Sequence, residues 1–195
     1  MQAVLLRNSI ECLNTQKRSI SVEWLEIFYR LLNLNYQNIG VIKMSNKEQF
    51  ILLDETYLPQ MAELFKKAFG REQWNDDWSD EKQLKEYIKE ISHSYNALNY
   101  ELLINGELAA LSIGMIRHWW EGTNYNIEEF CVSPDIQGQG IGSRFMNLIE
   151  KDIQNRGLCG IFLQTDSDKP AFNFYCKNGF IELESHVSFY KRVKK

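Results

Sequence analysis

The amino-acid sequence predicts an α/β fold with a mixed sheet, and three features of the chain support this. Strand-like runs and helical apolar patterns alternate from residue 49 onward. Asn105-Gly106, between two apolar runs, is a strong signal for the turn of a β-hairpin. The glycine-rich stretch 137–142 follows a strand-like run and leads directly into a helical pattern. A length of 195 residues suits one domain that can bury a substantial core.

Helices are assigned where apolar residues recur at helical spacing, and strands where short apolar runs lie between turn signals. The first helix carries Leu58, Met61, Leu64, Phe65 and Ala68 on one face, and the second carries Leu84, Tyr87, Ile88 and Ile91. The expected order is a strand at 50–53, the first helix, a helix at 80–92, strands at 100–104, 107–115 and 126–132, a helix after the glycine-rich loop, a strand at 160–164, a helix at 170–177, and final strands at 180–184 and 187–193.

Residues 1–43 differ in pattern from the rest of the chain, and we expect the folded domain to span residues 44–195. An amphipathic helix is expected around residues 21–34, where Trp24, Phe28 and Leu31 share one face. This extension is either an added segment without a role in the chemistry or a helix that packs on the domain or mediates dimerisation. A homodimer is therefore left open.

The composition is that of an ordinary soluble globular protein, with 44% hydrophobic and 25% charged residues. The net charge of −4 gives no electrostatic footprint for nucleic acid or an anionic membrane, and it mildly favours a cationic substrate. No apolar run reaches the roughly eighteen residues that span a bilayer, and the start is too short in apolar residues for a signal peptide. We expect a cytoplasmic protein.

The cysteines give no sign of a metal site or a disulfide framework. Cys12, Cys131, Cys159 and Cys176 form no C-x-x-C motif, and no histidine lies at a metal-ligand spacing from them. Cys131 has no apparent histidine partner that would make it a nucleophile. We therefore expect no metal and no acyl-cysteine chemistry.

The strand–loop–helix junction at residues 130–142 has the features of a pyrophosphate site. Glycines allow the backbone to approach a ligand closely, and the free N–H groups of a helix start attract phosphate. A P-loop is excluded because Gly-Ile-Gly-Ser at 140–143 contains no lysine. The glycine spacing also differs from the G-x-G-x-x-G of dinucleotide folds.

Two motifs in the expected order resemble the GNAT N-acetyltransferase superfamily. Gln137, Gly140 and Gly142 match the pattern Q/R-x-x-G-x-G/A of its acetyl-CoA loop. Residues 171–180 resemble its A-x-x-x-Y-x-x-x-G-F block. The resemblance covers residues 48–193 and implies a mostly antiparallel central sheet flanked by helices, with acetyl-CoA as co-substrate.

The resemblance also implies which groups hold acetyl-CoA. Backbone groups of Phe130, Cys131 and Val132 are expected to pair with the pantetheine arm as a further strand would. Backbone N–H groups of the loop are expected around the pyrophosphate, and these residues are Gln137, Gly138, Gln139, Gly140, Ile141, Gly142 and Ser143. The chain departs from the family at Asp168, where an asparagine is frequent, because a carboxylate cannot donate a hydrogen bond towards the cofactor.

Tyr175 is the candidate general acid, because the resemblance places it near the sulfur of the cofactor. A phenol can protonate a leaving thiolate, since its usual pKa of about 10 exceeds the value of about 8.5 for a thiol. Glu129 is the candidate base, with Glu128 on the opposite face of the same expected strand. The alternatives are a packed core tyrosine and a carboxylate that is solvated or ion-paired.

The acceptor is expected to be a primary amine that aromatic and acidic side chains recognise. Trp119, Trp120 and Glu121 suit an ammonium by cation–π contact and charge, and Trp78 lies in a similar aromatic–acidic stretch. The loop at 119–123, the strand at 128–132 and residues 186–190 are similar to those of bacterial aminoglycoside 6′-N-acetyltransferase-like members. A protein-lysine, N-terminal or polyamine acetyltransferase is left open, as is a non-catalytic acyl-CoA-binding sensor.

Overall fold

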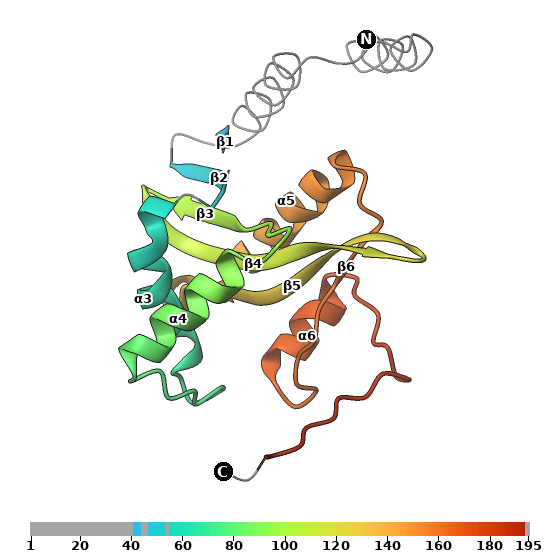
Figure 1. The fold of residues 1–195 in the computed structure, drawn as a ribbon. Helices are drawn as coiled ribbons and strands as arrows, with labels where there is room; N and C mark the ends of the chain where they lie inside the picture. The colour runs from blue at the N-terminus through green and yellow to red at the C-terminus, as the bar shows by residue number, and fades with distance from the viewer. Residues whose placement is uncertain (1–40, 44–46, 54, 194–195) are drawn as a thin grey trace, which may run out of the picture. The chain divides into compact units, whose positions relative to one another are not determined.

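A computed structural model describes residues 41–43, 47–53 and 55–193 of the chain (Figure 1). The chain divides into residues 1–40 and a compact unit that begins at Val41. The helix expected at 21–34 lies outside the described residues.

One six-stranded sheet forms the centre of the domain, and its strands lie in the order of the sequence. Every neighbouring pair is antiparallel except β5 and β6, which are parallel, so the predicted mixed and mostly antiparallel sheet is confirmed. The strands are β1 Val41–Lys43, β2 Glu48–Leu52, β3 Tyr100–Ile104, β4 Glu107–Trp119, β5 Gly122–Val132 and β6 Gly160–Phe162. The sheet therefore begins three residues before position 44.

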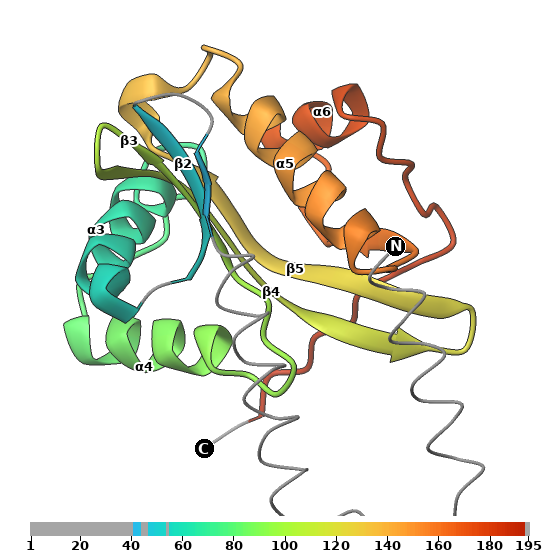
Figure 2. The same cartoon turned by 90° about the horizontal axis from the view of Figure 1, so that it is seen from above.

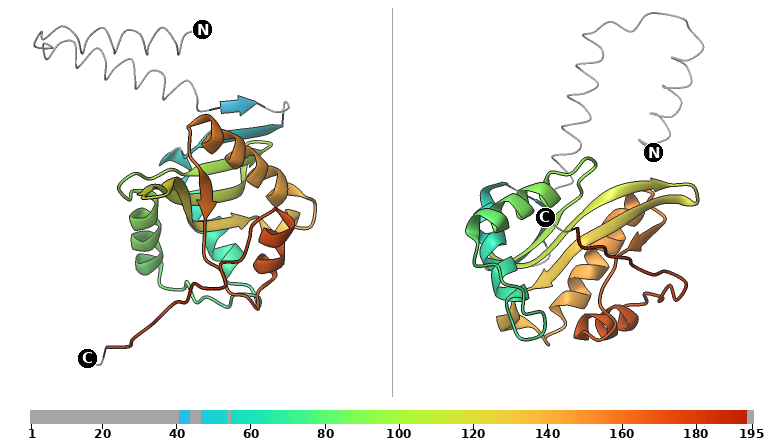
Figure 3. Two further views of the ribbon diagram at one scale, coloured as in Figure 1. Left: turned by 90° about the vertical axis from the view of Figure 1, so that its right-hand side faces the viewer. Right: turned by 60° about the horizontal axis from the view of Figure 1, so that its bottom comes forward.

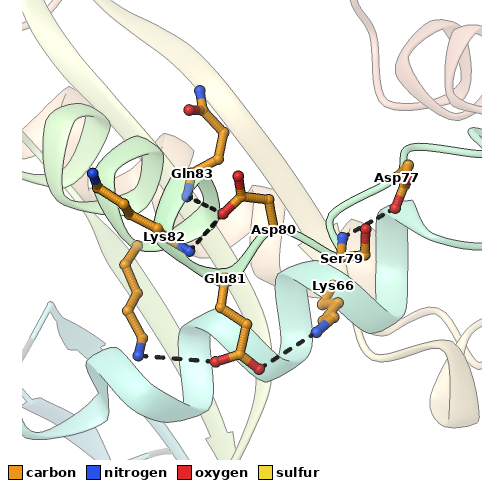
Figure 4. Close-up of polar contacts among 8 residues, drawn as sticks. Lys66, Asp77, Ser79, Asp80, Glu81, Lys82 and Gln83 are labelled. Carbon is orange, nitrogen blue, oxygen red and sulfur yellow. Dashed lines mark hydrogen bonds and ion pairs between the residues drawn. The ribbon is translucent and has the colours of Figure 1, made fainter.

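Helices cover both faces of the sheet, as the view in Figure 2 shows. One face carries α3 and α4, and the other carries α5 and α6. The helices are α3 Leu58–Phe69, α4 Glu81–Ser92, α5 Ile141–Asn155 and α6 Pro170–Lys177, with short 3-10 turns η1 Glu55–Tyr57 and η2 Pro134–Ile136. The start of α4 is fixed by Asp80, whose carboxylate accepts hydrogen bonds from the backbone N–H groups of Lys82 and Gln83 (Figure 4).

The two faces of the sheet carry two hydrophobic clusters. On the α3/α4 face, the apolar stripe of α3 packs against Leu111, Ile113 and Cys131. Of the five residues predicted to share that stripe, Leu58 is partly buried and the others are buried, namely Met61, Leu64, Phe65 and Ala68. On the α5/α6 face, the cluster is built around Phe145 and Ile149 of α5 and includes Tyr125 and Ile127 of β5. The helical periodicity read from the sequence thus marks the core faces.

A buried polar group also joins the sheet to α5. The Tyr100 hydroxyl donates a hydrogen bond of 2.7 Å to Asp152, which also forms an ion pair of 2.5 Å with Arg156. Burial, followed by this hydrogen bond, raises the pKa of Tyr100 well above its usual value. Tyr100 therefore stays a neutral donor and ties β3 to the helix that follows the glycine-rich loop.

A β-bulge interrupts the long β4–β5 ribbon beside the candidate site. Ile113 lies opposite Glu129, whereas Gly114 lies opposite Ile127, so Glu128 is the extra residue. A side chain at Gly114 would lie 2.2 Å from the carbonyl oxygen of Asn126. The bulge explains why Ile127 and Phe130 both belong to the cluster on the α5 side, although strict alternation would separate them.

The final strands predicted at 180–184 and 187–193 are absent from the structure, so this prediction is wrong for the described chain. The segment is extended and mostly exposed, with a turn in which the His186 N–H donates to the Leu183 carbonyl. A strand needs a hydrogen-bonded neighbour, and none of the described strands pairs with this segment. The strand predicted at 160–164 is also shorter, because β6 ends at Phe162.

Candidate active site

The glycine-rich loop connects β5 to α5 in a conformation that two glycines make accessible. Gly138 has φ of 77° and Gly140 has φ of 75°, in the left-handed region that residues with a side chain rarely adopt. Gly140 is the N-cap of α5, and within the described residues no side chain caps this helix start. The N–H groups of the first turn thus have no capping oxygen, and the helix dipole adds positive potential there. This arrangement fits an anion such as a pyrophosphate.

Contacts on both sides hold the loop in place. The Gln137 side-chain amide donates a hydrogen bond of 3.0 Å to the carbonyl oxygen of Val132, and Asp135 forms ion pairs with Lys67 and Arg71 of the α3 region. Gly142 faces α6, because a Cβ atom there would lie 3.0 Å from the Phe174 ring. The glycine at 142 therefore serves close packing of α5 against α6, whereas those at 138 and 140 serve the loop conformation.

The outer edge of β5 is open where the loop begins. β6 pairs with β5 only from Asn124 to Asn126, and no other strand of the described chain pairs with that edge. The Ser133 N–H donates to the Ala109 carbonyl on β4, so by alternation the backbone groups of Cys131 face β4. Those of Phe130 and Val132 face the open edge. An extended ligand such as a pantetheine arm could pair with the backbone of Phe130 and with the N–H of Val132, because the Val132 carbonyl already accepts from Gln137 and the Cys131 backbone faces β4.

Glu129 lies on the α4 side of β5 and contacts a tyrosine that the sequence did not single out for the site. The Tyr87 hydroxyl, from α4, donates a hydrogen bond to the Glu129 carboxylate. Burial raises the pKa of Glu129 to about 7; the hydrogen bond from Tyr87 lowers it, and the charges of Asp76 and Glu128 raise it. A carboxylate with this pKa can gain and lose a proton near neutral pH, as general base catalysis requires.

Tyr175 approaches the same part of β5 from α6. Its ring packs against Phe130, with ring centroids 6.4 Å apart, and against Phe180 at 5.3 Å. Burial, followed by the charge of Glu129, raises the pKa of Tyr175 above its usual value. The phenol therefore keeps its proton at neutral pH, as a general acid must. The sequence-predicted acid and base thus approach β5 from opposite faces of the sheet, close enough for the charge of Glu129 to act on Tyr175.

The neighbours of Glu129 on β5 have other roles. Glu128 is exposed at the bulge and does not lie within the apolar face that strict alternation predicts for it. Cys131 is buried, and burial together with the Glu129 charge raises the pKa of its thiol. A thiol in this state is a poor nucleophile, in agreement with the absence of a partner histidine in the sequence.

Trp78 lies behind the Tyr87–Glu129 pair. Its ring stacks on Tyr87, with centroids 5.1 Å apart, and meets Phe65 edge-on at 5.3 Å. The indole N–H is buried and has no hydrogen-bond partner among the described residues. Trp78 therefore packs against the Tyr87 ring and helps to hold it in place. Asp77 next to it accepts a hydrogen bond of 3.1 Å from the Ser79 backbone N–H (Figure 4), and the hydrogen bonds of Ser79 lower the pKa of Asp77.

The structure does not bring the other predicted acceptor residues to this place. Trp119, Trp120 and Glu121 lie at the tip of the β4–β5 ribbon, and Trp120 is 83% exposed (Figures 1 and 2). Glu121 precedes Glu129 by eight residues of mostly extended chain, which corresponds to roughly 25 Å. Asp168 is exposed ahead of α6 and lies 3.7 Å from the amino group of Lys169.

Tyr87 is the residue of this site that sequence reasoning missed. It was predicted only to lie on the inward face of α4, together with three aliphatic residues. Its hydroxyl was the available signal, because a buried phenol usually finds a hydrogen-bond partner.

Among the described residues, no three His, Cys, Asp or Glu side chains are arranged to hold a metal ion. No helix in the described part of the chain has the length and apolar character needed to cross a membrane.

Comparisons with known proteins agree with this arrangement. Residues 58–180 match the Acetyltransferase (GNAT) family. The [Ribosomal protein bS18]-alanine N-acetyltransferase of Escherichia coli K12 is 31% identical over 94 residues, which is 48% of this chain and 61% of that protein. The chain thus spans less than two thirds of the curated relatives it matches.

Solved structures with the same fold include two aminoglycoside acetyltransferases. The enzyme meta-AAC0020, from an uncultured soil metagenomic sample, in complex with trehalose superposes with a TM-score of 0.59 at 22% identity, over 77% of this chain and 99% of that chain. AAC(6′)-Iy in complex with the bisubstrate analogue CoA-S-monomethyl-acetylneamine gives a TM-score of 0.59 at 16% identity, over 75% of this chain and 99% of that chain. Since the family match covers residues 58–180, more than half of the chain, this protein belongs to the acetyltransferase (GNAT) family.

Proposed function

We propose that this protein transfers the acetyl group of acetyl-CoA to a cationic primary amine. The observation that carries the proposal is that Glu129 and Tyr175 flank the open edge of β5 from its two faces, close enough for the charge of Glu129 to raise the pKa of Tyr175. The carboxyl of Glu129, with a pKa of about 7, can accept a proton near neutral pH, and the raised pKa of Tyr175 keeps its phenol protonated. The bound acetyl-CoA would supply an activated acetyl thioester, and its pyrophosphate fits the uncapped start of α5.

The proton transfers are assigned to these two side chains. Glu129, as carboxylate, attracts the ammonium of the acceptor and accepts its proton, directly or through a water molecule. Tyr175, as neutral phenol, donates a proton to the departing thiolate. No side-chain nucleophile is required, which is consistent with the buried and protonated state of the Cys131 thiol.

The acceptor is proposed to be a small cationic amine, such as an aminoglycoside. The acidic groups that act on Glu129, namely Asp76 and Glu128, add negative potential near the attacking amine. The structural neighbours that act on aminoglycosides support this class. Trp119, Trp120 and Glu121 lie at the ribbon tip, roughly 25 Å along the chain from Glu129, and are therefore too far away to contact a small amine at that carboxylate.

A second candidate is acetylation of a protein N-terminus. It is favoured by the 31% identity to the enzyme that acetylates an alanine of ribosomal protein bS18.

One experiment tests all of these acceptors. Purified protein should be incubated with acetyl-CoA and a panel that contains an aminoglycoside, a polyamine, a peptide with a free N-terminal alanine and an N-blocked lysine peptide. Mass spectrometry of each acceptor identifies the product. Binding of acetyl-CoA without any acetylated product would favour the non-catalytic sensor instead.

A further inference from the structure

The outer half of the β4–β5 ribbon presents one polar and aromatic face to solvent. The ribbon reaches beyond α4, as Figures 2 and 3 show. Ile116 of β4 and Tyr125 of β5 belong to the cluster on the α5 side, so the residues that alternate with them lie on the other face. We call this the ribbon face, and its side chains are Met115, Arg117, Trp119, Asn124 and Asn126.

The ribbon face is continuous with the candidate active site. Glu129 lies on the same side of the sheet, because it pairs with Ile113 and its carboxylate accepts the hydrogen bond from Tyr87 of α4. From Glu129 to Gly122 the strand spans roughly 23 Å, at about 3.3 Å per residue. An extended peptide of about seven to eight residues has this length.

The side chains along this route change in character from one end to the other. Negative charge gathers at the inner end, where the charges of Asp76 and Glu128 act on Glu129. The middle carries Asn124 and Asn126, which are half-buried and whose side-chain amides form no hydrogen bond among the described residues. An amide of this kind can both donate to and accept from the backbone of an extended peptide.

The outer end of the ribbon face is cationic and aromatic. Trp119 is 58% exposed, and the exposed Arg117 guanidinium donates to the Met115 sulfur at 3.7 Å. A polyamine that reached this end would bring a second ammonium to Arg117, which repels it. One cation at the inner end, followed by a chain with amide groups and then acidic or apolar side chains, is the pattern that fits. A polypeptide with a free N-terminus has this pattern.

We propose that the ribbon face binds a polypeptide acceptor in extended form, with its N-terminal ammonium at Glu129. The side-chain amides of Asn124 and Asn126 hydrogen-bond to the peptide backbone. An acidic side chain at about the sixth position pairs with Arg117, and an apolar one at about the eighth packs on Trp119. The inference rests on the acetyl transfer proposed above and concerns its second candidate acceptor, a protein N-terminus. A small amine would use the inner end alone.

The reaction at the inner end is the one already assigned to Glu129 and Tyr175. The ammonium gives a proton to Glu129, the nitrogen bonds to the acetyl carbon, and the C–S bond breaks. Tyr175 protonates the departing thiolate, and the second proton released by the nitrogen returns to Tyr175 through water. The products are an N-acetylated peptide, free CoA and one proton.

Peptide length is the first test. The full chain should be assayed with acetyl-CoA and peptides of three, eight and twelve residues that share a free N-terminal alanine. The two longer peptides carry aspartate at the sixth position and leucine at the eighth. Their kcat/KM should be at least about tenfold higher than that of the three-residue peptide and similar to each other. Equal kcat/KM for three and eight residues overturns the inference.

Variants of the ribbon face then separate direct contact from a structural role. Arg117→Glu and Trp119→Ala should each lower kcat/KM of the eight-residue peptide by about threefold or more and leave that of the three-residue peptide unchanged. His118→Ala is the matched control and should keep the gain from length, because His118 is exposed on the same strand but on the opposite face. Lysine in place of aspartate at the sixth position of the peptide should restore the rate in Arg117→Glu.

The rate with the three-residue peptide also shows that each variant is folded and that its active site is intact. Equal losses for the short and the long peptide, or no rescue by the lysine peptide, overturn the inference. Acetylation of the amine panel without any gain from peptide length overturns the inference alone. The absence of any acetylated product overturns the proposed function, and the inference with it.

Discussion

The hydroxyl of Tyr87 donates a hydrogen bond to the carboxylate of Glu129 and so joins α4 to β5 at the candidate active site. The contact acts on the chemistry as well as on the fold, because it favours the ionised form of a carboxylate that burial would otherwise keep protonated. Tyr87 is thus a positioning residue that sets the pH range in which Glu129 can accept a proton.

Tyr87→Phe tests this role. Loss of the hydrogen bond should raise the pKa of Glu129 by several tenths of a unit to about one unit, because a net hydrogen bond contributes about 1 kcal/mol. The rising limb of the pH–rate profile should move to higher pH by the same amount, with the affinity for acetyl-CoA unchanged. Tyr95→Phe, at an exposed position, is the control. A profile that stays in place would show that Tyr87 is only a packing residue.

Tyr175→Phe should lower turnover by about 10²–10⁴-fold, the usual contribution of general acid catalysis. The affinity for acetyl-CoA should change little, because the ring and its contacts with Phe130 and Phe180 are kept. Steady-state kinetics and calorimetry with the same protein separate the two effects. A loss of less than severalfold would mean that water or another group protonates the thiolate.

Gly140→Gln should abolish acetyl-CoA binding at the glycine-rich loop. The left-handed backbone at this position disfavours a side chain, and the added side chain would project into the open space beside the helix start. Gly106→Gln is a matched control, because Gly106 has φ of 83° and equally open surroundings in the β3–β4 turn. Both variants should lose similar stability, and only the first should lose binding in calorimetry. Equal affinities in the two variants would place the cofactor elsewhere.

Residues 1–40 should be dispensable for folding and chemistry, so a chain that begins at Val41 should fold and keep its activity. The start is set at Val41 because β1 pairs with β2 and belongs to the compact unit. Thermal unfolding of the shortened chain measures whether it folds, and its turnover measures whether it keeps the activity. If the shortened protein does not fold, the expected helix at 21–34 contributes to the core or to a dimer interface.

Glu129→Gln should stabilise the protein at alkaline pH. The carboxyl pKa is about 7 in the folded chain and near 4.3 when unfolded, so the wild type loses stability as the pH rises from about 4.3 to about 7. The difference between the variant and the wild type should therefore grow from pH 4.5 to pH 8, by about 3 kcal/mol, and stay level above that. Glu107→Gln, at an exposed carboxylate, is the control. Urea unfolding at both pH values measures the free energy of unfolding of each protein. A difference between variant and wild type that is the same at both pH values would contradict a raised pKa of Glu129.

Local patterns in the sequence were sufficient to predict most of the fold. The helix at 170–177 and the strand at 100–104 match the structure residue for residue, because periodicity and turn signals depend on neighbours in the chain. The strands at 180–184 and 187–193 were wrong because a strand also needs a partner edge, which is a tertiary property. The β4–β5 ribbon is longer than predicted for the same reason, since pairing extends it from Ile116 to Trp119.

The candidate site was predictable in part. Glu129 and Glu128 were expected to lie on opposite faces of one strand, and the structure places Glu129 on the α4 face, where Cys131 also lies. The bulge that exposes Glu128 was not predictable, because it depends on the register between two strands. The partnership of Tyr87 with Glu129 spans 42 positions of sequence, and only the packing of α4 on the sheet brings the two together.

The pH dependence of acetyl transfer in the wild type and in Glu129→Gln tests the central claim most directly. With the acceptor identified from the amine panel, kcat/KM of the wild type should rise with a pKa of about 7. Glu129→Gln should lose this limb, with the largest loss of activity above pH 7, where the wild-type carboxylate is ionised. Glu107→Gln should retain it. An unchanged pH–rate profile in Glu129→Gln, or no acetylated product from the wild type with any amine, would contradict the account.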